Sequence, residues 1–171
     1  MDTQRRQVLQ ELCTTEEHFI ARLEGTIRLY VLPLRVESTR TWITGVPPDF
    51  AKLLDWFEDI MHLHRFMVTS LRSRLVDHES RHGASFRGGD ETVAELLGKF
   101  IHRLEVYQPY LVQLSGVVDL VGKMVDDGSN DLGQFIQMQQ KAGGGGDELQ
   151  QMLVEPVDML SKYPDIFRVS D

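Results

Sequence analysis

The chain has 171 residues, of which 42% are hydrophobic and 26% charged, and its formal net charge is −8. This length suits one globular domain with a sizeable core, and the acidic balance argues against a nucleic-acid surface and against strong unaided adhesion to anionic lipid. Its single cysteine, Cys13, excludes an internal disulfide. With no signal-peptide run and no apolar stretch near the roughly 20 residues of a membrane span, we expect an intracellular, cytoplasmic protein without direct membrane insertion.

The N-terminal half predicts two long helices. The first spans about residues 3–30, with apolar side chains three or four residues apart, as one buried helix face requires. Residues 35–48 form a polar connection that ends in two prolines, and Asp49 is the expected N-cap of the second helix. The apolar stripe of this second helix continues to Leu75.

A polar, glycine-rich stretch then predicts a loop over residues 77–90. Thr92 and Glu95 have the spacing of a capping box, in which each residue satisfies a backbone N–H group of the other at a helix start. The third helix should follow, with a kink at Pro109.

The C-terminal part predicts shorter elements. Helices are expected at 117–125 and 132–140, a glycine hinge at 143–146, and a final helix over 149–168 capped by Asp147. No segment alternates apolar and polar residues over the length of a strand. The whole pattern therefore predicts a single elongated all-α bundle.

The final helix keeps its apolar period through Pro156, which lacks an N–H group and crowds the preceding turn. We expect this helix to be kinked or held by tertiary packing. Glu155, Asp158 and Lys162 fall together on its polar side. Asp158 and Lys162 have the spacing of an i,i+4 ion pair, which would be worth only about 0.3–0.5 kcal/mol.

Glu16 stands out in the first helix because it lies in line with the apolar stripe, four residues after Leu12 and three before Phe19. A carboxylate there is either an edge residue facing water or a group left for a partner. Because no partner is obvious nearby in the sequence, we expect its truncation to change stability little.

Other chemical motifs have simpler explanations. Residues 78–82 match the H-E-x-x-H pattern of zinc hydrolases, but they lie in a polar stretch that meets glycines, so a zinc hydrolase is rejected and no metal site is expected. His62 and His64 are expected at the rim of their helix, and Cys13 should be a small buried hydrophobe. The sequence offers no catalytic residue.

Several segments, taken in order, resemble the signatures of the Dbl-homology (DH) domain. The first is E-L-x-x-T-E-x-x-F-I-x-x-L at residues 11–23, and the last is P-V-x-x-L-x-K-Y-P at 156–164. Between them, residues 50–64, 98–110 and 135–140 are also similar to segments of this family. Each segment alone is an ordinary amphipathic helix, so the resemblance rests on their order and spacing.

The resemblance implies that residues 1–171 form one DH domain, the exchange-factor module for Rho-family small GTPases. The domain would promote GDP release without covalent chemistry and without a cofactor. Glu16, preceded by Thr15, would contact switch I of the GTPase. Lys162 and Asp158 would contact switch II.

Two departures from the family pattern qualify this expectation. The family usually carries glutamine and arginine after proline-valine, whereas this chain carries Asp158 and Met159, which lower the positive field around Lys162. The family's last helix also continues for several turns beyond K-Y-P, whereas the chain ends at Asp171. We therefore expect a last helix that is incomplete and no pleckstrin-homology domain. The alternative is a DH-like scaffold that binds a GTPase or another DH protein but exchanges nucleotide poorly.

Overall fold

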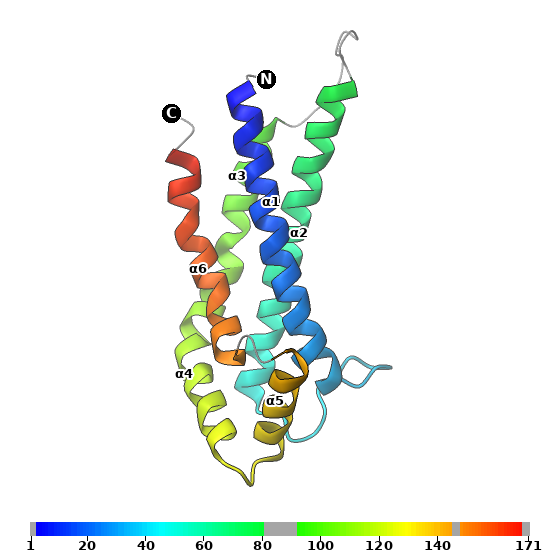
Figure 1. The fold of residues 1–171 in the computed structure, drawn as a ribbon, viewed down its shortest axis with the longest axis vertical. Coiled ribbons are helices and arrows are strands. Elements are labelled where there is room, and N and C mark those ends of the chain that lie inside the picture. Colours follow the sequence, from blue (N-terminus) through cyan, green and yellow to red (C-terminus); the bar gives the residue numbers. More distant parts are fainter. Residues whose placement is uncertain (1–2, 81–91, 145–147, 169–171) are drawn as a thin grey trace.

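The computed structural model describes residues 3–80, 92–144 and 148–168. In these ranges the chain is all-α, since no strand occurs and a single isolated bridge joins Arg35 to Trp42. Long helices run side by side along the molecule, and α4 and α5 close the end opposite the two termini (Figure 1). The predicted elongated helical bundle is confirmed.

Helix α1 covers Thr3–Thr26 and continues through a π-helical turn, Ile27–Val31, into a 3₁₀ turn, Leu32–Leu34. The predicted first helix is therefore confirmed, although its winding changes over the last turns. Pro33 lies in the 3₁₀ turn, where its missing N–H group cannot continue an α-helical ladder.

Helix α2 covers Pro48–Ser80. Pro48 occupies its first position, where a missing N–H group costs nothing. Asp49 lies inside the first turn, so the prediction of Asp49 as the N-cap was wrong by two residues. The loop predicted from residue 77 was also wrong at its start, because α2 continues to Ser80; the rest of that predicted loop lies outside the described residues.

Helix α3 covers Val93–Arg103, and its capping box is confirmed. The Glu95 N–H donates to Thr92 Oγ1 at 3.2 Å, and the Thr92 N–H donates to Glu95 Oε2 at 2.7 Å. Both bonds satisfy backbone donors that a helix start otherwise leaves without partners.

A 3₁₀ turn over Leu104–Val106 separates α3 from helix α4, Tyr107–Asp126. The predicted irregularity thus lies one turn before Pro109, because a proline ring crowds the carbonyl four residues back, here that of Glu105. The separate helix predicted at 117–125 is the second half of α4.

Helix α5 covers Asp131–Ala142, and helix α6 covers Leu149–Arg168. Helix α6 passes through Pro156 and Pro164 without a break, and Pro156 is buried. The Tyr110 hydroxyl donates a hydrogen bond of 2.6 Å to the Leu153 carbonyl. Tertiary packing therefore holds the helix at its first proline, as the sequence allowed.

The core runs along the axis of the bundle. Helix α1 packs on α2 and α6, α2 also packs on α3 and α4, and α4 packs on α5 and α6. None of the helices in the described ranges is both long and apolar enough to cross a membrane. The fold therefore places α1 and α6 next to each other, with the rest of the bundle behind them.

Candidate functional site

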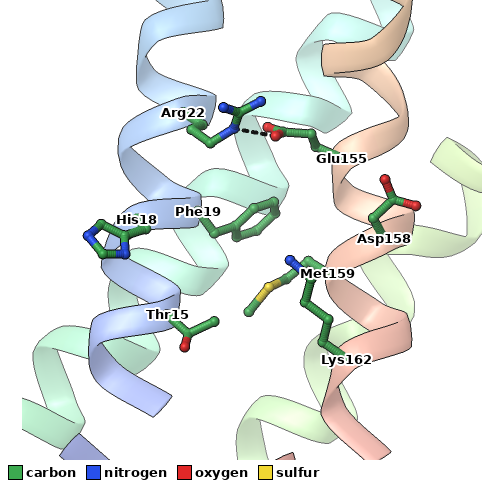
Figure 2. A pocket seen from close by; sticks show the side chains of 8 residues that line it. All are labelled: Thr15, His18, Phe19, Arg22, Glu155, Asp158, Met159 and Lys162. Carbon is green, nitrogen blue, oxygen red and sulfur yellow. Dashed lines mark hydrogen bonds and ion pairs between the residues drawn. The ribbon is translucent and has the colours of Figure 1, made fainter. Parts of the chain in front are cut away.

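A groove of about 410 Å³ lies between α1 and α6 (Figure 2). It brings together Thr15, Asp158 and Lys162, three of the four residues that the sequence predicted to contact a GTPase. The spacing of the lining residues explains the groove, since positions three or four apart share one face of a helix. Each helix contributes four such side chains: Thr15, His18, Phe19 and Arg22 from α1, and Glu155, Asp158, Met159 and Lys162 from α6.

The groove has an apolar floor and a charged rim. Phe19 and Met159 are buried and form the floor. Near one end, Arg22 Nε donates to Glu155 Oε1, an ion pair that crosses from α1 to α6 (Figure 2). Lys162 lies toward the other end of the groove.

Asp158 and Lys162 are both exposed at this rim. No ion pair found within the described residues joins them, and Figure 2 shows the Lys162 side chain extending along Met159 while Asp158 points elsewhere. The i,i+4 pair considered from the sequence is therefore not formed. The carboxylate and the ammonium group face solvent separately, so each can meet a partner's groups on its own.

Glu16, the fourth predicted contact residue, does not line the groove. Its side chain is fully buried directly behind Thr15. Tyr163 donates its hydroxyl to Glu16 Oε1, and His64 Nδ1 lies 2.6 Å from Glu16 Oε2. Glu16 is thus neither a water-facing edge residue nor a group without internal partners. Its contact with switch I stays a prediction.

His64 is the residue that the sequence reasoning missed, because it was expected at the helix rim. It is fully buried, and its Nε2 lies 2.7 Å from the Tyr107 hydroxyl. The rings of Phe19 and Phe100 meet it edge-on, with centroids at 4.8 and 5.3 Å. Its spacing could have revealed this position, because 57, 60, 64, 67 and 71 form one stripe of α2 whose other members are all buried and apolar.

Tyr163 and Tyr107, the tyrosines around Glu16, keep their phenol protons and so act as hydrogen-bond donors. Burial, and then the negative charge of Glu16, raise the pKa of Tyr163 far above its usual range. The same two causes, in the same order, raise the pKa of Tyr107. Both phenols therefore keep their protons at any physiological pH.

Metal and thiol chemistry gain no support at this site. The described part of the chain contains no group of three or more His, Cys, Asp or Glu residues placed to hold a metal ion. The motif at 78–82 extends beyond the described residues, so the rejection of a zinc hydrolase stays a prediction. Cys13 is buried as expected, and burial raises the pKa of its thiol.

Comparison with known protein families identifies the family of this chain. The family model of the RhoGEF domain matches residues 8–168, which include both sides of the groove and the buried residues behind it. No curated protein sequence matches the chain.

Proposed function

Because the chain belongs to the RhoGEF (Dbl-homology) domain family, whose members regulate Rho-family GTPases as guanine-nucleotide exchange factors, we propose that the groove between α1 and α6 is the surface that binds the GTPase and remodels its two switches. The observation that carries this proposal is the meeting of Thr15, Asp158 and Lys162 along one groove from opposite ends of the sequence. We further propose that the protein acts in the cytoplasm and that partners recruit it to membranes.

In this proposal the exposed ammonium group of Lys162 attracts acidic groups of switch II, and Asp158 accepts hydrogen bonds from the same segment. Thr15 meets switch I from the opposite side of the groove. Glu16, which is buried next to Thr15 in the chain, holds this side of the contact in place through its bonds to Tyr163 and His64.

The exchange mechanism follows from binding linkage. A protein that binds the nucleotide-free GTPase more tightly than the loaded form must weaken nucleotide binding by the same factor. Opening the switches displaces the magnesium ion and loosens the phosphates, so GDP leaves faster. Such a regulator performs no covalent chemistry and needs no cofactor of its own.

A second candidate is a binding module that exchanges nucleotide poorly. Two observations favour it: an acid, Asp158, stands at the groove rim beside Lys162, and Glu16 is fully buried in this conformation. Such a module would hold a GTPase or another DH protein without opening the switches.

Release of fluorescent GDP from a panel of Rho-family GTPases tests the proposal. We expect faster release from at least one GTPase, and we expect Lys162→Glu to abolish the acceleration. Lys141→Glu is the matched control, because Lys141 is also exposed but lies on α5, outside the groove. If no GTPase responds, or if both variants lose activity alike, the groove is not the exchange surface.

A further inference from the structure

Five helices meet at one buried polar cluster behind the groove. The cluster consists of Glu16 from α1, His64 from α2, Tyr107 from α4 and Tyr163 from α6, and Phe100 from α3 packs against it. Phe100 also meets the ring of Tyr163, with centroids at 6.0 Å. The cluster lies between the groove and the rest of the bundle.

The hydrogen bonds of this cluster form a closed set. The Tyr163 hydroxyl donates to one oxygen of Glu16, and His64 Nδ1–H donates to the other. His64 Nε2 then accepts a hydrogen bond of 2.7 Å from the Tyr107 hydroxyl. With a neutral imidazole every member is satisfied, and a satisfied buried network holds its members in one arrangement.

This inner cluster is joined through the backbone to the two sides of the groove. Glu16 follows Thr15 on α1, and Tyr163 follows Lys162 on α6. The bond between Glu16 and Tyr163 therefore fixes how far apart Thr15 and Lys162 stand. The ion pair from Arg22 to Glu155 also joins α1 to α6, but its arginine is half exposed, so solvent weakens it.

We propose that Tyr163 is a positioning residue, which sets the separation of α1 and α6 through its hydrogen bond to Glu16 and so gives the groove the width that its partner requires. The separation follows from the buried contacts alone. Its consequence for exchange rests on the function proposed above.

The matched pair Tyr163→Phe and Tyr110→Phe tests this role. Both tyrosines are buried, and the hydroxyl of each donates a hydrogen bond that involves α6. The Tyr110 bond, however, runs from α4 to the Leu153 carbonyl and touches no residue of the groove. Tyr110→Phe therefore reproduces the loss of a buried hydroxyl without loosening α1 from α6.

Two readouts separate positioning from mere stability. The first is the distance between nitroxide labels on cysteines placed at Thr14 and Ser161, two exposed positions beside the groove; the buried native Cys13, whose thiol pKa is raised, reacts poorly with the label. The second is the rate of GDP release at a temperature where all variants are folded.

We expect Tyr163→Phe to widen the distance distribution and to slow GDP release about tenfold, because small misplacements of contact groups are costly. Tyr110→Phe should change neither readout. Unchanged distances in Tyr163→Phe, or an equal loss of exchange in both variants, would overturn the positioning role. If the wild type fails to exchange but Tyr163→Phe still widens the distances, the proposed function fails and the positioning role stands.

Discussion

Glu16 has its charge held entirely inside the protein, and this makes its truncation costly. Glu16→Ala removes the acceptor of Tyr163 and of His64 at once and leaves both polar groups buried. A buried donor left without its acceptor typically costs about 1–3 kcal/mol, and this variant leaves two such donors. We therefore expect a large fall in the melting temperature, measured by circular dichroism, rather than the small change that the sequence alone suggested.

Glu17→Ala is the natural control for this measurement. Glu17 is next in the chain, but it is exposed and makes a bidentate bond to Arg72 at 2.7 and 2.8 Å. An exposed pair of this kind contributes less than about 1 kcal/mol. If Glu16→Ala were as mild as Glu17→Ala, the buried cluster would not stabilise the fold.

Asp158 is the groove residue whose change should increase activity. Asp158→Gln removes a negative charge beside Lys162 and restores the residue usual in the family at that position. We expect faster GDP release from a responsive GTPase, with a gain that shrinks as salt rises, because the added attraction is partly long-range. Met159 should not be exchanged for arginine in the same variant, since its side chain is only 2% exposed and a charge would be buried.

Asp119→Asn changes the net charge by the same amount at an exposed position of α4 outside the groove. The two variants assayed in parallel separate a local effect from a general one. An equal gain in both would point to overall charge, and no gain in Asp158→Gln at low salt would mean that Asp158 does not limit exchange.

The residues of the groove were predictable to different degrees. Thr15, Asp158 and Lys162 follow from local motifs, and the helical period explains why they face one groove. The partners of Glu16 are 48 and 147 residues away in the chain. Such pairs depend on how the helices pack, and the residue spacing within one helix does not indicate which side chains of a neighbouring helix it will meet.

At the scale of elements, the close approach of α4 and α5 depends on one glycine. A Cβ atom added to Gly133 would lie 1.7 Å from the Met124 carbonyl oxygen, which belongs to the backbone and cannot rotate away. Gly133→Ala should therefore separate α5 from α4 and destabilise the protein by more than about 2 kcal/mol. Urea unfolding followed by circular dichroism measures this change.

Gly116→Ala is the matched substitution with the opposite expectation. Gly116 lies inside α4, is exposed, and has nothing within 4 Å of an added Cβ atom. Alanine there should stabilise the protein by about 0.5–1 kcal/mol, since it restricts the unfolded chain and favours the helix. Equal effects in the two glycine variants would mean that α4 and α5 are not in backbone contact.

The helices themselves were predictable where the sequence carries a local signal. The capping box at Thr92 predicted the start of α3, and the apolar period predicted that α6 continues through its prolines. The π-helical turn at 27–31 carries no such signal, because its winding depends on what packs against it. The extension of α2 to residue 80 was missed because the polar residues from 77 onward are typical of a loop. A polar stretch can nevertheless continue a helix that packing has already begun.

At the scale of the whole molecule, the bundle brings the beginning and the end of the chain to one groove. Helices α1 and α6 pack directly on each other, and α2 and α4 support them from behind. A GTPase seated on this groove would touch both helices at once. The free energy of that contact is available to hold the switches open only if the loaded GTPase cannot make the same contact.

Binding linkage therefore separates an exchange factor from a scaffold. If the protein exchanges nucleotide, its affinity for the nucleotide-free GTPase should exceed that for the GDP-loaded form by at least roughly tenfold, and GDP with magnesium should dissociate the complex. Titration calorimetry with the two forms of one GTPase measures the ratio, and Lys162→Glu should weaken both. Equal affinities for the two forms, with GDP release unchanged, would contradict exchange and favour the scaffold, because a protein that binds both states equally shifts neither.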